Sequence, residues 1–290
     1  MNNVIVEQTV LNKIKPRKPV ANKGDFGRLL FVVTSKGMPG AGVLCASAAL
    51  RSGAGLVRLA IPESNYIPVA SQLAEPVYEI LPENEAGTLD MRSADRLIKL
   101  SEKSDVMLLG CGLGCNEDTE KLTAHIIENI KIPLVLDADG INSLIPNILL
   151  LGKIKIPVIL TPHPGEMSML TGLSVAEVQA DRQNIASGFS CRHGVILVLK
   201  GHHTIIALPD GALFTVTKGN PGMATGGSGD VLAGIIASLM GQGLSAEDAA
   251  VCGVYIHAEA GDRASQKLSQ QSVLPTDIIK NLPKIFRACL

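Results

Sequence analysis

Several features that mark particular protein classes are scarce or absent in this sequence. It contains no Trp, three Tyr and five Phe, so few side chains could stack on nucleic-acid bases. Its net charge is −1, and its one local basic cluster is short: Lys13, Lys15, Arg17 and Lys18. We interpret this cluster as a solvated arm rather than a nucleic-acid footprint. The composition therefore argues against nucleic acid as a partner.

Long apolar segments are also missing. No apolar run of about twenty residues exists, which argues against a membrane partner. The early sequence contains Asn, Glu, Lys and Pro instead of the apolar core of a secretion signal. The six cysteines form no Cys-x-x-Cys pair, and we interpret them as reduced, buried thiols. These absences favour a cytoplasmic protein.

Hydrophobic patterning, in contrast, is strong. Hydrophobic residues make up 46% of the 290 residues and charged residues 18%, which is typical of a globular chain. Apolar runs that favour strands occur at Arg28–Thr34, Leu56–Ile61, Val77–Leu81, Asp105–Leu109, Leu134–Leu136, Val158–Leu160 and Val195–Leu199. Because helical patterns alternate with these runs, we expect an α/β fold with a mostly parallel sheet covered on both faces. No linker or repeat interrupts the pattern, so we expect one domain over residues 1–290.

The helical patterns lie between the strands and at both ends. We expect a short helix and then a loop before residue 24, and a hairpin at Ile205–Leu208 and Leu213–Val216. Ser174 and Glu177 form a capping-box pattern for a helix that runs to about Ala186. Further expected helices are Ala41–Arg51, Arg92–Leu100, Thr119–Asn129, one capped by Ser245 that runs to about Ala264, and Thr276–Arg287.

The most unusual stretch runs from Asn220 to Gly243. Five of the eleven residues 219–229 are glycine, and an apolar helical pattern begins at Val231. A glycine-rich loop that leads into a helix exposes backbone N–H groups at the positive end of the helix dipole, and this arrangement binds anions, above all phosphate. Asp230 lies at the same junction, where it could accept a proton or help to hold a metal ion. The alternative is a glycine-rich turn with Asp230 as a first-turn acid.

Four further loops follow the ends of predicted strands: Gly110–Cys115, Asp137–Asn142, Thr161–Glu166 and Lys200–Thr204. In a parallel sheet these ends share one edge, where ligands bind. The first loop fails the dinucleotide-binding pattern, because Cys115 stands where the third glycine should be. We therefore expect it to pass close to a ligand rather than to serve hydride transfer.

Each of the other three loops carries candidate chemistry. His163 lies between two prolines, which favours a ligand contact, and Lys200 suits a nucleotide phosphate. Asp137 and Asp139 could hold Mg²⁺ through water, or Asp137 could cap the turn at Gly140. Glu166 could be the first-turn acid of the next helix or a carboxylate close to a metal ion. An anion site, a lysine loop and several acids together indicate phosphoryl transfer, with Asp230 as proton acceptor.

Five motifs, in chain order, resemble those of the ADP/ATP-dependent NAD(P)H-hydrate dehydratases, which are ribokinase-like proteins. The resemblance extends from about Gly24 to the C-terminus. The motifs are Ala-Leu-Arg-Ser-Gly-Ala-Gly-Leu-Val-Arg58, Asp-Ala-Asp-Gly-Ile-Asn142, Thr-Pro-His-Pro-Gly-Glu166, Val-Leu-Lys-Gly-His-His-Thr204 and Gly-Asn-Pro-Gly-Met-Ala-Thr-Gly-Gly-Ser-Gly-Asp230.

The resemblance implies a three-layer αβα ribokinase-like fold and a carbon–oxygen lyase. Such an enzyme phosphorylates the hydroxyl of the S-form hydrate of NADH or NADPH with ADP or ATP and Mg²⁺, and phosphate elimination restores the cofactor. The implied hydrate contacts are Ala41, Gly112 or Gly114, His163 and Asp230. The implied nucleotide contacts are Lys200, Gly201, His202, His203, Thr204 and Gly229.

The resemblance also implies a homotetramer. Some relatives carry an additional epimerase domain, for which this chain is too short, so we expect a stand-alone dehydratase. The main rival is a small-molecule kinase of the same fold. Such kinases commonly carry an Asn-x-x-Glu motif for the metal, and this sequence has none. A nucleotide-binding module without catalysis is the non-enzyme alternative, and it would not need Asp230.

Overall fold

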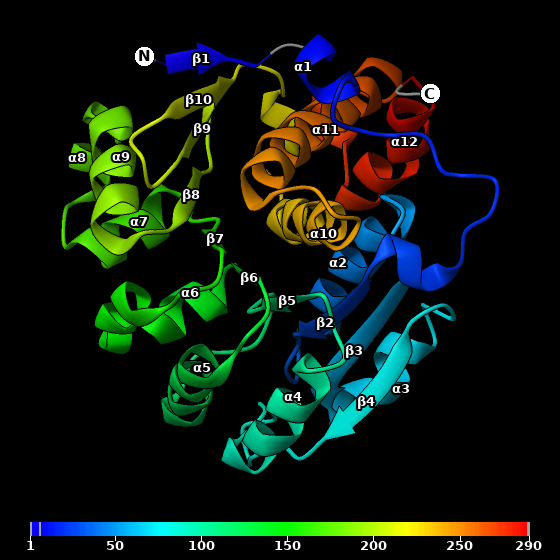
Figure 1. The fold of residues 1–290 in the computed structure, drawn as a ribbon, viewed down its shortest axis with the longest axis vertical. Helices are drawn as coiled ribbons and strands as arrows, with labels where there is room; N and C mark the ends of the chain where they lie inside the picture. The colour runs from blue at the N-terminus through cyan, green and yellow to red at the C-terminus, as the bar shows by residue number, and fades with distance from the viewer. Residues whose placement is uncertain (1, 6, 289–290) are drawn as a thin grey trace.

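A single ten-stranded sheet organises the computed structural model, which describes residues 2–5 and 7–288 (Figure 1). The strand order is β1-β10-β9-β8-β7-β6-β5-β2-β3-β4. The strands are β1 (Asn2–Val4), β2 (Arg28–Val32), β3 (Leu56–Pro62), β4 (Val77–Leu81), β5 (Val106–Leu109), β6 (Leu134–Leu136), β7 (Val158–Leu160), β8 (Ile196–Leu199), β9 (Thr204–Ala207) and β10 (Leu213–Val216).

Helices cover both faces of this sheet (Figure 1). The α-helices are α1 (Glu7–Leu11), α2 (Pro39–Arg51), α3 (Glu63–Ala70), α4 (Ala94–Ser101), α5 (Glu117–Asn129), α6 (Asp139–Leu144), α7 (Pro164–Thr171), α8 (Val175–Ala180), α9 (Arg182–His193), α10 (Ser228–Gly241), α11 (Ala246–Lys267) and α12 (Pro275–Ala288). The 3₁₀ segments are η1 (Lys23–Phe26), η2 (Met91–Ser93), η3 (Ile145–Lys153), η4 (Pro221–Met223) and η5 (Gln270–Ser272). The expected three-layer α/β architecture is confirmed.

Seven neighbouring strands, from β8 to β4, are parallel, while β9 is antiparallel to both β8 and β10. Strands β9 and β10 form the expected hairpin. Since β6, β7 and β8 are parallel neighbours, their carboxyl ends lie at the same edge of the sheet. The loops that begin at Asp137, Thr161 and Lys200 therefore start side by side.

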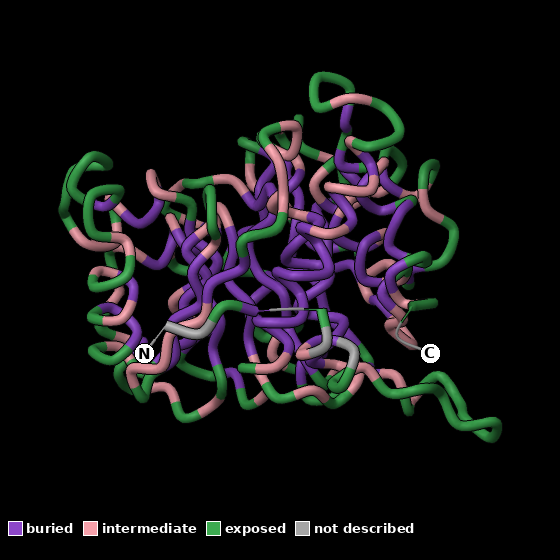
Figure 2. Tube along the Cα trace, turned by 90° about the horizontal axis from the view of Figure 1, so that it is seen from above, coloured by how far each residue is buried: buried purple, intermediate pink, exposed green. Residues whose placement is uncertain are grey.

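Successive side chains along each strand point to opposite faces of the sheet, so the core has two layers. On β2 and just beyond it, Leu29, Phe31 and Val33 pack into the layer that contains α2, α10, α11 and α12. The intervening Leu30 and Val32 pack on the opposite layer, with α4, α5, α7 and α9. Both sets are fully buried, as expected for a strand covered on both faces. Figure 2 shows the buried residues concentrated in the centre of the molecule.

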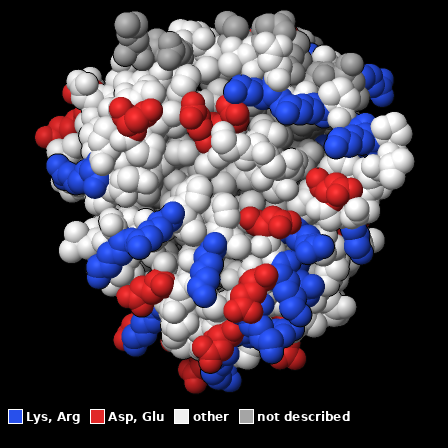
Figure 3. Space-filling view, viewed as in Figure 1, with Lys and Arg blue, Asp and Glu red and all other residues white. Residues whose placement is uncertain are grey.

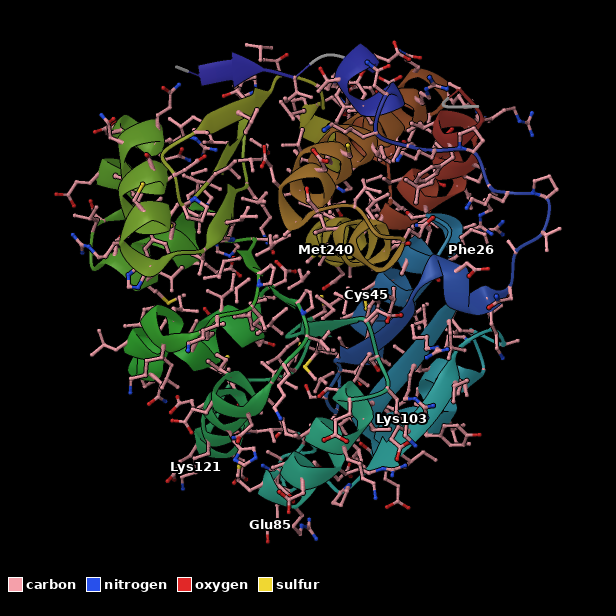
Figure 4. The ribbon with its side chains drawn as sticks, in the orientation of Figure 1. Phe26, Cys45, Glu85, Lys103, Lys121 and Met240 are labelled. Carbon is pink, nitrogen blue, oxygen red and sulfur yellow. The ribbon has the colours of Figure 1, made fainter. Side chains whose placement is uncertain are left out.

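Helix α10 packs closely on α2 because its facing residues are small. A Cβ atom at Gly234 would lie 2.2 Å from the carbonyl oxygen of Cys45, so only glycine permits this approach. Figure 4 shows Cys45 on α2 and Met240 on the neighbouring α10. Nearly all of α10 is buried. The close packing fixes the position of the helix start, where the glycine-rich loop ends.

Several parts of the predicted secondary structure differ from the observed one. The polar N-terminal region contains strand β1, whose pairing with β10 its composition does not reveal. The helix capped by Ser174 ends at Ala180, because Asp181 adopts φ −140° and ψ 51°, and α9 starts afresh. Helix α3 falls in a stretch for which no element was predicted. Helix α6 begins at Asp139, inside the stretch 137–142 that was predicted to be a loop.

Two further observations concern the length of the helices and the charges on the surface. Within the described part of the chain, no helix is both long and apolar enough to cross a membrane. On the face shown in Figure 3, Lys and Arg side chains are interspersed with Asp and Glu side chains. This face therefore carries no broad single-sign patch of the kind that nucleic-acid binding favours.

Candidate functional site

A cavity of about 910 Å³ lies where the carboxyl ends of β6, β7 and β8 face the start of α10. Most of the predicted site residues line it. They are His163, Lys200, Gly201, His202, His203, Thr204, Gly229 and Asp230. The expectation that strand-end loops meet the glycine-rich stretch at one edge is thus confirmed. Residues of three loops line the cavity, and in the fourth the Cys111 thiol lies within 4.8 Å of carboxylate oxygens of Asp137 and Asp230.

The start of α10 presents unpaired backbone donors to this cavity. Among the described residues, the N–H groups of Gly226, Gly227, Gly229 and Asp230 have no hydrogen-bond acceptor. Gly227 has φ 93°, and a Cβ atom there would lie 2.4 Å from Leu44 Cδ1, so this position requires glycine. Four free N–H groups at the positive end of a 14-residue helix are an arrangement that favours anion binding.

A buried ion pair forms the wall opposite this helix start. The Lys200 ammonium lies 2.7 Å from Asp137 Oδ1 and 3.7 Å from Glu166 Oε2. Thr161 Oγ1 donates a second hydrogen bond to Asp137 Oδ1, at 2.6 Å. Burial opposes ionisation of Asp137, but the Lys200 charge and the hydrogen bonds from Lys200 and Thr161 outweigh it and lower the pKa of Asp137. Asp137 is therefore ionised at neutral pH.

Asp230 has a different environment from Asp137. Burial, together with the nearby negative charge of Asp137, raises the pKa of Asp230 to about 6. Ligand atoms of Asp137, Asp230 and Cys111 all lie within 4.8 Å of one another. A hydrogen bond with Cys45 and burial raise the pKa of the Cys111 thiol well above its usual range, so Cys111 remains a neutral donor. Asp230 can therefore take up a proton near neutral pH, as a general base requires.

His163 and Glu166 form a reciprocal cap at the start of α7. His163 Nδ1 accepts hydrogen bonds from the N–H groups of Gly165 and Glu166, at 3.0 and 3.1 Å. Glu166 Oε2 accepts the His163 N–H at 2.7 Å. Burial and the charge of Asp137 raise the pKa of Glu166, while Lys200 opposes this shift. Glu166 is thus both the expected first-turn acid and a neighbour of Lys200.

A family model described as NAD(P)H-hydrate dehydratase matches residues 29–284. The chain belongs to the NAD(P)H-hydrate dehydratase family. It is 39% identical over 251 residues to the ADP-dependent (S)-NAD(P)H-hydrate dehydratase of Neisseria meningitidis, covering 86% of this chain and 80% of that protein. It is 41% identical over 275 residues to the bifunctional NAD(P)H-hydrate repair enzyme of Thermofilum pendens, covering 95% of this chain and 52% of the relative. The chain thus spans about half the length of the bifunctional relatives that it matches.

Solved structures agree with this family assignment. The ADP/ATP-dependent NAD(P)H-hydrate dehydratase of Bacillus subtilis superposes with a TM-score of 0.84 at 27% identity, covering 100% of this chain and 99% of that chain. Ribokinase of Thermotoga maritima shares the fold alone, with a TM-score of 0.54 at 15% identity over 89% of this chain and 100% of that chain. The ribokinase-like fold expected from the motifs is confirmed.

The remaining contacts that the family resemblance implies lie outside the cavity lining. Gly112 lies against Ala41, since a Cβ atom at Gly112 would be 2.8 Å from that of Ala41. The Gly114 N–H donates to Asp139 Oδ2 at 2.8 Å. Asp139 thus ties the Gly110–Cys115 loop to the start of α6 and does not face the cavity beside Asp137. The roles of Ala41, Gly112 and Gly114 in binding the hydrate stay predictions.

The turn after β6 is strained in a way that the sequence did not reveal. The Gly140 N–H donates to the backbone oxygen of Asp137 at 3.0 Å, and Ala138 between them adopts φ 48° and ψ −119°. A non-glycine residue in this region costs about 1–3 kcal/mol. The backbone turn explains why the Asp137 side chain does not cap Gly140 and instead reaches Lys200.

Helix α11 supplies cavity residues that sequence reasoning missed. Val254, His257 and Ala258 line the cavity from successive turns of one helix face. Burial lowers the pKa of His257 to about 4, so it is neutral, and its Nε2 lies 3.3 Å from Ser228 Oγ. An apolar helix face with a single His is typical of an ordinary core helix. The sequence therefore gave no sign that α11 lines the cavity.

Proposed function

We propose that this chain dehydrates the S-form hydrate of NADH or NADPH in a reaction that consumes ADP or ATP. The observation that carries the proposal is the placement of Asp230. Its carboxyl group belongs to the last of the four residues with free backbone donors and faces the same cavity. A phosphate bound at these donors and a hydroxyl beside Asp230 would therefore meet.

The reaction has two steps. Asp230 takes the proton of the hydrate hydroxyl while that oxygen attacks the terminal phosphorus of the nucleotide, which leaves AMP from ADP or ADP from ATP. The ring carbon–oxygen bond of the phosphate ester then breaks, and phosphate leaves with the bonding electron pair. Loss of a proton from the neighbouring ring carbon restores the double bond of NADH or NADPH.

The N–H groups of Gly226, Gly227 and Gly229 would stabilise the charge that develops on the transferred phosphoryl group. Lys200 would add positive charge on the opposite wall, where a Cβ atom at Gly229 would lie only 3.3 Å from its Nζ. Glycine at position 229 thus lets the Lys200 ammonium lie close to the helix start.

Mg²⁺ belongs to this proposal as a companion of the nucleotide. Mg²⁺ is usually held by one or two carboxylates together with substrate phosphates and water. Here Asp137 is engaged by Lys200 and Thr161, and Glu166 by Lys200 and the His163 N–H. The Asp230 carboxylate has a ligand atom within 4.8 Å of those of Asp137 and Cys111, but it serves as the base in this proposal. We therefore propose that the ion enters with the nucleotide phosphates.

Further parts of the proposal concern the protein as a whole. We propose one dehydratase domain over residues 1–290, acting in the cytoplasm as a homo-oligomer, with a tetramer as the form expected from the family resemblance. The continuous sheet from β1 to β4 supports the single domain. The Neisseria meningitidis relative, named as ADP-dependent, supports ADP as the donor.

A turnover assay tests the proposal. Incubation with the S-form hydrate, ADP and Mg²⁺ should restore NADH absorbance and release one phosphate for each NADH. Asp230→Asn should lose this turnover while it retains nucleotide binding. Asp95→Asn, which makes the same change at an exposed site on α4, is the matched control and should leave turnover unaltered. Consumption of ATP with a pyrimidine alcohol, and none with the hydrate, would instead indicate a small-molecule kinase.

A further inference from the structure

We propose that Arg182 is a positioning residue for the nucleotide. Its guanidinium holds the backbone at the end of β8 and thereby fixes Lys200 and the Gly201–Thr204 loop on the cavity wall. The inference rests on the proposed function, because it assigns Arg182 to nucleotide binding at the same site. Arg182 itself does not line the cavity.

The guanidinium binds two successive carbonyl groups. Arg182 Nη2 donates to the Leu199 oxygen at 3.0 Å and to the Lys200 oxygen at 3.3 Å, while Nη1 lies 3.4 Å from the Lys200 oxygen. Nη1 also donates to Gln179 Oε1 at 3.1 Å. A planar fork of donors can span two neighbouring carbonyl groups, whereas a single ammonium group cannot do so with the same geometry. The contact therefore fixes the chain direction where Lys200 leaves the strand.

The charge of Arg182 has no carboxylate partner among the ion pairs of the described residues. Burial alone lowers the pKa of Arg182, although the group stays protonated at neutral pH. A half-buried cation that is bound only to neutral oxygens is electrostatically costly unless an anion lies nearby. The contact places this positive charge directly behind the Lys200–Gly201 backbone of the cavity wall.

The loop that Arg182 supports is also held at its start, where the Lys200 N–H donates to the Pro162 oxygen at 2.8 Å and the Lys200 ammonium pairs with Asp137. A Cβ atom at Gly201 would lie 2.6 Å from Arg182 Nη1, so the guanidinium packs directly against the loop backbone. The tips of the loop, His202 and His203, are exposed and stack on each other with ring centroids 3.8 Å apart. Within the loop, Thr204 Oγ1 donates to the Gly201 oxygen at 3.1 Å. Loss of the guanidinium should therefore loosen this wall of the cavity while leaving the strand itself in place.

Calorimetric titration with ADP and Mg²⁺ tests this inference without relying on turnover. We expect Arg182→Gln to raise the Kd for ADP about tenfold, or ~1.4 kcal/mol. The Kd for the hydrate, titrated in the same way without nucleotide, should change less than about twofold. Arg182→Lys, which keeps the charge but loses the fork, should raise the Kd about threefold. Arg192→Gln is the matched control: it removes the same charge from an exposed position on α9 and should leave the Kd unaltered.

Three results would overturn the inference. They are equal Kd values for Arg182→Gln and Arg192→Gln, an equal loss of hydrate and nucleotide affinity, and full ADP affinity in Arg182→Lys. If Arg182→Gln fails to fold by circular dichroism, Arg182→Lys decides by the same criterion. If the unmodified chain itself binds no adenine nucleotide, the proposed function fails and the role of Arg182 fails with it.

Discussion

Asp230→Asn should make the folded chain more stable at alkaline pH while it abolishes turnover. A pKa of about 6 in the folded state, against an ordinary value of 3.8, means that folding disfavours ionised Asp230 by on the order of 3 kcal/mol. Because the folded-state pKa is raised, the stability linked to the neutral carboxyl is present below pH 4 and is lost as the pH rises through about 6. Asn removes this penalty, since it cannot ionise.

The gain in unfolding free energy should therefore depend on pH. We expect the Asn variant to exceed the unmodified chain by about 3 kcal/mol at pH 8 and by about 1 kcal/mol at pH 4.5. Urea denaturation with linear extrapolation measures both values. Asp95→Asn, on an exposed turn of α4, should show no such trend. Equal stability of Asp230→Asn and the unmodified chain at pH 8 would refute the raised pKa of Asp230 on which the mechanism depends.

Three further predictions follow from the same site. The kcat/KM for the hydrate should fall about tenfold for each pH unit below about 6, because protonated Asp230 cannot accept the hydroxyl proton; a flat profile down to pH 5 would exclude this base. Lys200→Met should lower the unfolding free energy by about 3 kcal/mol or more, because it leaves the Asp137 carboxylate buried without its cation. In denaturation experiments, the additional change Asp137→Asn should recover part of that loss. Gly227→Ala, at φ 93°, should cost about 1–3 kcal/mol of stability and weaken ADP binding. In Gly226→Ala the added Cβ meets no atom within 4 Å, so this variant should unfold at the same urea concentration as the unmodified chain.

Much of the fold could be predicted because its strands are short apolar runs buried on both faces. The pattern at Arg28–Thr34, for example, requires helices on two sides, and the alternating Leu29 and Leu30 fill the two layers. Strand β1 could not be predicted in this way, since its place is set by pairing with β10, which lies about two hundred residues away in the sequence. The end of α8 before Asp181 also could not be predicted, because a capping box marks where a helix starts but not where it ends.

Some residues of the candidate site could also be predicted from the sequence, and others could not. Glycine-rich and proline-rich loops have compositions that ordinary turns do not need, so Gly229, His163 and Lys200 could be singled out from the sequence. The pairing of Lys200 with Asp137 could not be foreseen, because it depends on a backbone turn in which Ala138 adopts a positive φ. Nor could the α11 face be recognised, since its residues have the composition of a core helix.

The fate of the hydrate hydroxyl oxygen tests the proposed mechanism most directly. The hydrate can be prepared with a heavy-oxygen label in its hydroxyl group and incubated with ADP and Mg²⁺. If that oxygen attacks phosphorus before the carbon–oxygen bond breaks, the label must appear in the released inorganic phosphate, with one labelled phosphate for each NADH. Recovery of the label in water, with unlabelled phosphate, would contradict phosphorylation of the hydrate.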